Sequence, residues 1–362
     1  MKALFLIIFL ATVFIASAQP PASRRAPVLD SSYGFGLIFD QDFFTPQNQD
    51  RNYTMGVSIN VSGPVFDRNY FVLPWLRKGA DRLFGISKWH NEGEHYFTGL
   101  QFFDGAFTPL NLESTTPLRD DRPYGNILGL ASSRTTVINA SSDDMREQSS
   151  ITTRFVIGIL GTRVGEAVQT YIHKKYFSGK RAVPVGWPTQ ISDGGEPTLL
   201  YQLQIMKPLF EEVNPNEPRL KRIQATWTME ANLGYYTNLA SGFAFRIGRF
   251  TTPYWKFTNS GMTTVSQKAT RIDKKPEFSF FIQFRGRAVV YNALLQGQFK
   301  HTDYVLMGNQ VNRFLLEAEN GFLFNLGKFT LIYEPFIMRT SETALPLARN
   351  HSWGSAAVYF NW

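Results

Sequence analysis

The stretch "QATWTMEANLGY", residues 224–235, alternates apolar and polar side chains at every second position. Successive side chains of a β-strand point to opposite faces, so this period of two predicts a strand with one apolar and one polar face. A strand of about ten residues with that pattern suits a barrel wall that has lipid outside and a polar interior. The apolar face consists of Ala225, Trp227, Met229, Ala231, Leu233 and Tyr235.

Two further segments carry the same alternation, residues 278–290 ("FSFFIQFRGRAVV") and residues 356–362 ("AAVYFNW"). In the first, Arg285 and Arg287 fall opposite the phenylalanines, so we expect both arginines inside the barrel. The second ends the chain on Trp362, which resembles the C-terminal assembly signal of bacterial outer-membrane barrels. A soluble β-sandwich would also alternate. The length of the strands and an aromatic content of 15% favour the membrane barrel.

The whole chain therefore predicts an all-β protein, a twelve-stranded antiparallel transmembrane barrel of the outer membrane with a short helix in an extracellular loop. An even number of strands fits antiparallel closure with both ends of the chain on the periplasmic side. The predicted strands are residues 34–42, 53–62, 95–103, 124–138, 149–161, 197–207, 222–236, 240–249, 277–290, 311–325, 328–341 and 351–362.

The N-terminus matches a secretory signal peptide over residues 1–18. One lysine precedes an apolar run, and the small residues Ala16 and Ala18 form a cleavage motif. The predicted mature chain, residues 19–362, contains no apolar stretch of about 18 residues that would form a transmembrane helix. It also contains no cysteine, so disulfides cannot stabilise it. We therefore expect one exported barrel domain.

The chain is basic, with a formal charge of +8. A basic surface suits an anionic partner such as a phosphorylated lipid headgroup. Nucleic acid carries the same sign of charge, but an exported protein does not meet it in the membrane. We therefore expect a membrane lipid as the partner and no nucleic acid.

Strand parity assigns each connection to one side of the membrane. Connections after odd-numbered strands face outward, so we expect the site in the outward loops, around residues 40–54, 104–123 and 162–196. The segment 64–94 falls on the periplasmic side. It contains "PWLRKGADRLFG", residues 74–85, which we interpret as a structural or membrane-surface helix without chemistry.

The third outward loop contains "VGEAVQTYIHKKYFSG", residues 164–179, which replaces the strand pattern with a helical one. Residues three, four and seven positions apart share one face of a helix. The polar side is expected to face a cleft while the apolar side packs on the barrel wall or rim, and Gly179 is expected to end the helix. The polar side consists of Glu166, Gln169, Thr170 and His173, and the apolar side of Val168 and Ile172.

A single histidine in a loop is usually solvated, and His173 taken alone would be interpreted in that way. Its helical spacing places it with Glu166, Gln169 and Thr170 on the side that is expected to face a cleft. The remaining histidines are expected to be solvent-exposed; they are His90, His95, His301 and His351.

Two stretches beside the first outward loop carry oxygen-bearing side chains. Asp40 and Asp42 end the first strand in "FDQDFF". Thr54 begins the second strand, where we expect it to point inward while Tyr53 and Met55 face lipid. Carboxylate and hydroxyl oxygens near one another suit a hard cation such as calcium. A solvated acidic loop is the alternative.

Five stretches stand in a characteristic order and spacing: "FDQDFF", "DRNYTMG", "DDRPYGNILGL", "GEAVQTYIHKK" and "GWPTQISDGGEP". As a set they resemble the outer-membrane lipid A deacylase family of the LpxR type. The resemblance implies a calcium-dependent lipid A 3′-O-deacylase, a carboxylic ester hydrolase that removes the 3′-acyloxyacyl chain of lipopolysaccharide in the outer leaflet. It also implies a site that faces the cell surface, and we expect a monomer.

The resemblance further implies roles for individual residues. His173 matches the general base that activates water, and calcium near Asp42 would polarise the ester carbonyl. Gln41 stands where the family often has asparagine, and the second outward loop has Arg119 and Arg122 in place of a lysine. The implied catalytic residues are His173, Asp42, Thr54 and Gln169, the implied substrate-binding residues are Arg119, Arg122 and Gln41, and the implied calcium ligands are Asp42 and Asp40.

Two other classes of protein stay open at this point. One is a catalytically silent barrel that serves as a channel or binding protein, which the departures from the family and the inward Arg285 and Arg287 favour. The other is an outer-membrane phospholipase, which would also hydrolyse esters. Its motif is incomplete here, because "NHSWG", residues 350–354, lacks the asparagine expected after Ser352.

Overall fold

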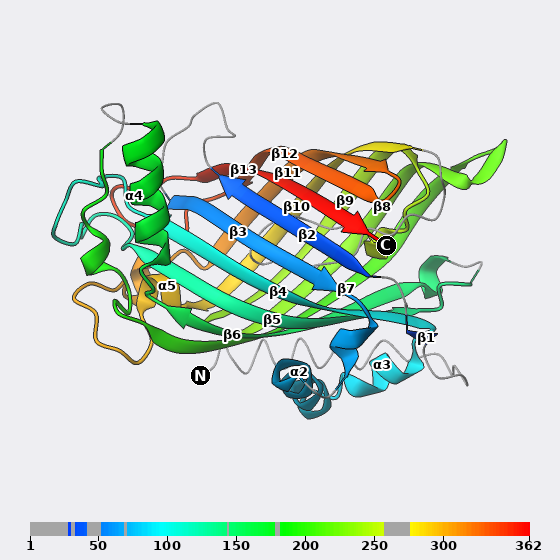
Figure 1. The fold of residues 1–362 in the computed structure, drawn as a ribbon, viewed down its shortest axis with the longest axis horizontal. Helices are drawn as coiled ribbons and strands as arrows, with labels where there is room; N and C mark the ends of the chain where they lie inside the picture. The colour runs from blue at the N-terminus through cyan, green and yellow to red at the C-terminus, as the bar shows by residue number, and fades with distance from the viewer. Residues whose placement is uncertain are drawn as a thin grey trace.

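The computed structural model describes residues 28–29, 33–41, 52–68, 71–142, 145–177, 182–256 and 276–362. The predicted signal peptide, residues 1–18, lies outside the described residues. Twelve antiparallel strands, β2 to β13, close into a barrel because the last of them pairs with the first (Figure 1). The predicted fold class is therefore confirmed.

Each strand of the barrel pairs with its neighbours in the sequence, which is the simplest antiparallel arrangement. The barrel strands are β2 Gly34–Gln41, β3 Asn52–Ser62, β4 His95–Thr108, β5 Gly125–Ile138, β6 Ser149–Leu160, β7 Glu196–Asn214, β8 Glu217–Gly234, β9 Tyr236–Phe250, β10 Glu277–Asn292, β11 Phe314–Leu326, β12 Phe329–Arg339 and β13 His351–Asn361.

The strand boundaries differ from the prediction where the wall meets the candidate site. β4 continues to Thr108, whereas the prediction ended it at residue 103. The second outward connection is therefore residues 109–124. A short strand that was not predicted, β1 Val28–Leu29, pairs in parallel with the start of β4.

The two faces of the wall have the polarity that the alternation predicts. On β10, Phe284 is 49% exposed on the outer face, whereas its neighbour Gln283 is 1% exposed inside. Arg285 and Arg287 also point inward and are paired there with glutamates, as predicted. The outer face therefore presents apolar side chains to the membrane, while the interior holds polar ones.

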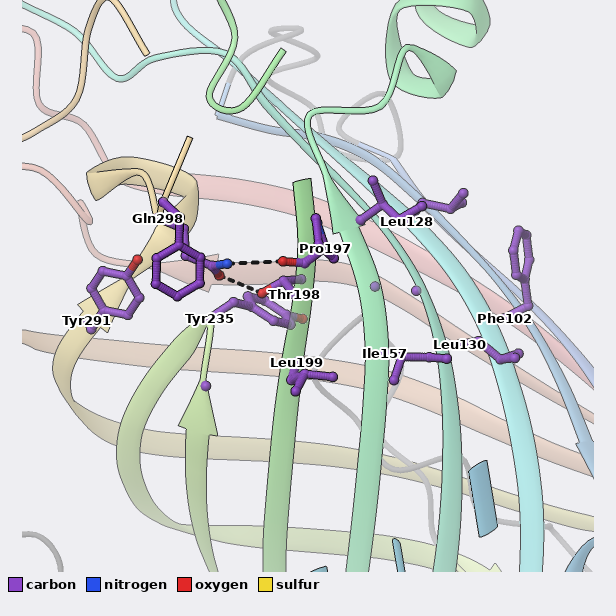
Figure 2. A pocket seen from close by; sticks show the side chains of 15 residues that line it. Phe102, Leu128, Leu130, Ile157, Pro197, Thr198, Leu199, Tyr235, Tyr291 and Gln298 are labelled. Carbon is purple, nitrogen blue, oxygen red and sulfur yellow. Dashed lines mark hydrogen bonds between the residues drawn. The ribbon is translucent and has the colours of Figure 1, made fainter. Parts of the chain in front are cut away.

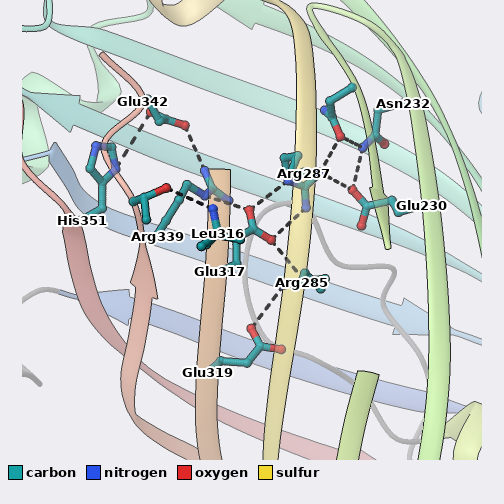
Figure 3. A network of polar contacts seen from close by, with 12 residues as sticks. Glu230, Asn232, Arg285, Arg287, Leu316, Glu317, Glu319, Arg339, Glu342 and His351 are labelled. Carbon is teal, nitrogen blue, oxygen red and sulfur yellow. Dashed lines mark hydrogen bonds and ion pairs between the residues drawn. The ribbon is translucent and has the colours of Figure 1, made fainter. Parts of the chain in front are cut away.

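Ion pairs occupy the interior of the barrel (Figure 3). Arg287 Nη1 lies 2.7 Å from Glu230 Oε1, and Arg287 Nε lies 2.9 Å from Glu317 Oε1. Arg339 Nε lies 2.9 Å from Glu317 Oε1, and Arg339 Nη1 lies 3.0 Å from Glu342 Oε1. Buried charges persist only when they are paired in this way. The cavity beside this network measures only about 60 Å³, so side chains fill this part of the interior, which does not favour a channel.

Four helices accompany the barrel in the described residues. α4, Val164–Tyr176, and α5, Ala293–Gln296, lie at the end that strand parity assigns to the cell surface (Figure 1). α2, Val72–Leu83, and α3, Ser87–Glu92, lie against the barrel toward the other end (Figure 1). α2 confirms the helix predicted for residues 74–85. In the described part of the chain, no helix combines the length and the apolar character needed to cross a membrane.

Candidate functional site

Helix α4 packs directly on the outer surface of β4 and β5. Phe102 and Leu130 are exposed on that surface, and side chains alternate along unbroken strands, so Asp104 and Asn126 share their face. A Cβ atom on Gly165 of α4 would lie 2.9 Å from Asn126 Nδ2. Only glycine permits this close approach, so the sequence brings the helix onto the wall at this position.

The helix turns its polar side toward the wall. Gly165, Gln169 and His173 are its buried residues, at positions i, i+4 and i+8. Gln169 and His173 share a face, as predicted, while Gly179 lies outside the described residues. Val168, which was predicted to pack on the wall, is instead 37% exposed, whereas Ile172 is half-buried. The wall beneath the helix is itself polar and the surroundings are a membrane, so polar side chains gain partners by facing inward.

His173 is 2% exposed and is held in one orientation by the backbone. Its Nδ1 lies 2.5 Å from the carbonyl oxygen of Ala182. A carbonyl only accepts hydrogen bonds, so Nδ1 carries the proton in the neutral ring. The lone pair that can accept a proton is then on Nε2, which is the arrangement that a catalytic base needs.

Gln169 connects α4 to Trp187, which lies in the loop that follows the helix. Its Oε1 accepts a hydrogen bond of 2.9 Å from Nε1 of Trp187. Trp187 is fully buried in a cluster with Met55 and Ala106 of the wall. The indole therefore connects α4 to β3 and β4. Sequence reasoning gave Trp187 no role of its own, although it lies in the quoted motif "GWPTQISDGGEP".

Thr54 lies on the outer face of the wall rather than inside. A β-bulge between Tyr53 and Met55 shifts the register of β3 against β4. Thr54 Oγ1 lies 2.6 Å from Thr108 Oγ1, and Thr108 follows Ala106 on the outer face. The prediction that Thr54 points inward was wrong because the alternation does not pass through a bulge. Thr54 consequently shares the outer face with the buried side of α4.

The bulge also reverses the predicted orientation of Tyr53. We expected it to face lipid, but its ring packs inside the barrel against Trp353, with centroids 5.0 Å apart. Its hydroxyl donates a hydrogen bond of 2.8 Å to Asp40 Oδ2. Met55, which was also expected to face lipid, is buried beneath Trp187.

Asp40, one of the two implied calcium ligands, lies on the inner side of β2. Asp40 points into the barrel, where its other oxygen accepts a hydrogen bond of 2.6 Å from Ser355. Gln41 is the next residue and points outward, opposite Met55 in the register. Asp42 lies outside the described residues. Among the described residues, no group of three or more His, Cys, Asp and Glu side chains is placed to hold a metal ion.

The two arginines of the second outward loop have different environments. Arg122 is buried, with its guanidinium 4.5 Å above the ring of Phe107 and 3.3 Å from Glu342 Oε2. Burial lowers the pKa of Arg122 to about 10, so it still carries its charge at neutral pH. Arg119 is exposed, and its carbonyl accepts a hydrogen bond of 2.7 Å from Tyr304. The structure therefore places Arg122 inside the mouth of the barrel, apart from α4.

A polar cluster on the wall beneath α4 was not predicted. Asn126 Nδ2 donates a hydrogen bond of 3.0 Å to Asp104 Oδ1, and Thr162 donates to Asn126 Oδ1. Asp104 is a carboxylate on the membrane-facing side of the barrel, although it is almost fully covered. The sequence does contain a signal for this position, because the alternation that places Phe102 on the outer face continues to Asp104. The predicted strand ended at residue 103 and therefore did not include Asp104.

An apolar groove of about 990 Å³ runs along the outer wall over β4 to β7, beside this cluster (Figure 2). Leu128, which pairs with Asp104, lines its upper part, and Ile157 and Leu199 line its floor. Gln298 closes one side by hydrogen bonds to Pro197 and Thr198, as Figure 2 shows. The groove offers an apolar surface next to a polar cluster, which matches the division between acyl chains and headgroups in a lipid.

The remaining histidines fall into two groups. His95 and His301 are exposed, as predicted. His90 and His351 are buried, which corrects the expectation that they are solvated. His351 and Ser352 lie on opposite faces of β13, so they do not form the base and nucleophile of a phospholipase. His90 belongs to a polar network beneath α2.

The fold and the site together define an outer-membrane β-barrel protein with a buried histidine on the wall-facing side of an extracellular helix. The chain belongs to the family described as Outer membrane protein LpxR, which it matches over residues 4–362. The predicted family and the predicted localisation in the outer membrane are thus confirmed.

Among the similar solved structures, LpxR shows the same fold. LpxR from Salmonella typhimurium is similar with a TM-score of 0.68 at 13% identity, over 90% of this chain and 99% of that chain. The β-domain of the Bordetella autotransporter BrkA is similar with a TM-score of 0.39 at 11% identity, over 92% of this chain and 100% of that chain. No curated protein matches the chain.

Proposed function

We propose that the protein is a lipid A 3′-O-deacylase that hydrolyses the ester of the 3′-acyloxyacyl chain of lipopolysaccharide in the outer leaflet. The observation that supports the proposal is the position of His173, which is buried on the same side of α4 as Gly165, the residue that lies against the outer wall of an LpxR-family barrel. A base in the barrel lumen would be separated from lipid by the wall. A base on the outer face is within reach of a substrate that diffuses in the membrane.

His173 acts as the general base. With Nδ1 held by the carbonyl of Ala182, Nε2 takes a proton from water as the water oxygen attacks the ester carbonyl carbon. The carbon–oxygen bond to the sugar then breaks, and the proton passes from Nε2 to the departing oxygen. The products are a free carboxylic acid and a sugar hydroxyl, so the reaction needs no nucleophilic side chain.

Thr54 and Gln169 position the reacting groups. The hydroxyl pair of Thr54 and Thr108 lies on the outer face of the wall, where either oxygen can donate to a substrate oxygen. Gln169 accepts the hydrogen bond from Trp187 and so keeps α4 and the following loop together. Loss of this bond would leave a buried indole donor without its partner, which is unfavourable.

Calcium fits the chemistry of the donors at the upper edge of β2. Gln41 offers an amide oxygen there, and Asp42, the next residue, offers the carboxylate that a calcium site requires. Asp40 is the weaker candidate, because both its oxygens already accept hydrogen bonds inside the barrel. When bound, calcium would supply positive charge that stabilises negative charge developing on the ester oxygen.

The surroundings of the site suit a phosphorylated lipid. The apolar groove beside Leu128 offers a surface for an acyl chain on the membrane side. Lys174 and Lys175 are exposed at the end of α4 and supply positive charge toward the headgroups. Arg119 is exposed and is a third candidate for phosphate contact, whereas Arg122 is committed to Glu342 inside the barrel.

The test is the acyl pattern of lipid A in outer membranes that contain the protein. Mass spectrometry should show loss of the 3′-acyloxyacyl chain with the wild type and an intact pattern with His173→Gln. His301→Gln is the matched control, because that histidine is exposed and distant in sequence from α4. Removal of a general base lowers the rate by about 10²–10⁴-fold. An unchanged acyl pattern with folded wild-type protein and added calcium would refute the assignment.

The metal requires its own measurement. Activity should disappear after chelation and return with calcium rather than magnesium, because magnesium demands a tighter octahedral site. Asp42→Asn should raise the calcium concentration needed for activity. Asp40→Asn is the comparison variant, and it should leave that concentration unchanged.

A further inference from the structure

Helix α2 packs with its polar side against the barrel and its apolar side outward. Its buried residues are Leu73, Pro74, Arg77 and Asp81, so the buried side carries a charged pair one turn apart beside two apolar residues at the start of the helix. Trp75 is 62% exposed and Leu83 is 80% exposed on the opposite side, together with Val72. A helix on the surface of a water-soluble protein has the reverse arrangement, with apolar residues toward the core.

The buried polar side of α2 has specific partners on the wall. Arg77 Nη1 lies 2.6 Å from Asp81 Oδ2, and Tyr201 of β7 donates a hydrogen bond of 2.9 Å to Asp81 Oδ1. His90 of α3 contacts Thr136 of β5 at 2.7 Å and Thr153 of β6 at 3.0 Å. These contacts hold the helix pair in a defined position on the barrel.

The wall residues that contact α2 point to the outside of the barrel. Tyr201 follows the exposed Leu199 by two positions on β7, and Thr153 precedes the exposed Ile157 by four positions on β6. Both pairs share a face because side chains alternate along a strand. α2 and α3 therefore lie outside the barrel, with α2 against the middle of the wall and α3 nearer the end opposite α4 (Figure 1).

The surface of α2 divides into three sectors. Val72, Trp75 and Leu83 form the outward apolar stripe, with helical positions i, i+3 and i+11. The second sector faces the wall. Lys78 and Arg82 lie four residues apart on the basic flank between the other two, where Lys78 pairs with Asp67 at 3.4 Å and Arg82 is the exposed cation.

We propose that α2 is an in-plane membrane helix that inserts its apolar stripe into the periplasmic leaflet of the outer membrane. The occupant of the stripe is phospholipid acyl chain, because the stripe lies on the same outer wall as the lipid-facing Leu199 and Ile157. The basic flank contacts anionic headgroups at the membrane surface, as in other interfacial helices. This inference is independent of the proposed deacylase activity.

Site-directed spin labelling tests the proposal in the full barrel. The chain has no cysteine, so single substitutions label one position only. Leu83→Cys is the test variant, Phe284→Cys on the β10 wall is the lipid-exposed control, and His301→Cys in an outward loop is the aqueous control. Each is reconstituted in vesicles of phosphatidylethanolamine and phosphatidylglycerol. Relative accessibility to oxygen and to a water-soluble nickel chelate is then measured.

The label at position 83 should resemble the label at 284, with high accessibility to oxygen and low accessibility to the nickel chelate. A result that resembles the label at 301 would overturn the proposal, because the stripe would then face water. The proposal would also be overturned if the label at position 83 were shielded from both reagents in native outer membranes but accessible to the nickel chelate in vesicles. That result would indicate that a protein partner covers the stripe. Trp75→Cys should repeat the result at the second position of the stripe.

Discussion

Gly165 offers the sharpest test of how α4 is held. A Cβ atom at this position would lie 2.9 Å from Asn126 Nδ2, 3.0 Å from Trp187 Cη2 and 3.1 Å from Ala106 Cβ. Gly165→Ala therefore forces the helix and the wall apart by a few tenths of an ångström. Gly79→Ala in α2 is the matched control, because a Cβ atom there would have no neighbouring atom within 4 Å.

The two substitutions separate packing from helix propensity. Alanine in place of glycine gains about 1 kcal/mol in a helix interior, as at Gly79, and up to about that amount at Gly165, which is the second residue of α4. At Gly165 the overpacked contact costs about 1–3 kcal/mol, so docking of α4 is expected to weaken by about 0–2 kcal/mol. At Gly79 only the gain in helix propensity remains, because the added Cβ atom contacts nothing. The difference between the variants is thus the packing cost itself.

Amide hydrogen exchange measures both effects in the folded barrel. Protection of α4 amides should fall by up to about 30-fold in Gly165→Ala, while protection of α2 amides should rise about fivefold in Gly79→Ala. The deacylase rate should fall in the first variant only, because a small displacement of a catalytic group has large kinetic effects. Equal gains in protection for the two helices would show that α4 does not lie directly on the wall.

Three further predictions concern the interior, the groove and the loop. Burial raises the pKa of Glu342, but the surrounding basic groups outweigh burial and hold it at about 2, so its charge contributes about 3 kcal/mol above pH 4.5. That contribution is lost as the pH falls from 4.5 to about 2. Urea unfolding in micelles should therefore show the difference in unfolding free energy between wild type and Glu342→Gln shrinking over this pH range. A constant difference would contradict the ion pairs. Ile157→Trp should fill the groove and lower the deacylation rate for substrates with long acyl chains. Leu316→Trp on the far wall is the control and should leave that rate unchanged. Equal rates in the two variants would show that the acyl chain does not bind in the groove. Trp187→Phe should weaken the packing of the third outward loop by about 1–3 kcal/mol because Gln169 loses its buried partner, which hydrogen exchange in α4 would detect.

The barrel was predictable because alternation is a direct consequence of strand geometry. On β10, each apolar residue from Phe278 to Phe284 that was assigned to lipid lies on the outer face, and Arg285 and Arg287 lie inside with their glutamates. The membrane and the polar interior impose opposite preferences on the two faces, so the pattern persists over the length of a strand. The pattern becomes ambiguous where a wall residue is covered by another element, as at Asp104.

Thr54 shows why the site itself was harder to predict. Its register follows from the bulge between Tyr53 and Met55, and a bulge inserts one residue without any required sequence signature at this position. Every side chain beyond the bulge changes face, so Tyr53 enters the barrel and Thr54 joins Thr108 outside. A pattern read from one strand cannot detect this shift, because the shift is a property of the paired strands.

The orientation of Val168 on α4 was predicted wrongly for a different physical reason. The expectation that an apolar helix face packs on the protein assumes that water lies on the other side. Around this barrel the solvent next to the wall is lipid, so the preference reverses, and Val168 of α4 and Leu83 of α2 both face outward. The polar faces, with His173 in one helix and Arg77 in the other, are then enclosed against the wall. The same reversal that encloses the ion pair of α2 also encloses Gln169 and His173 on the wall-facing side of α4.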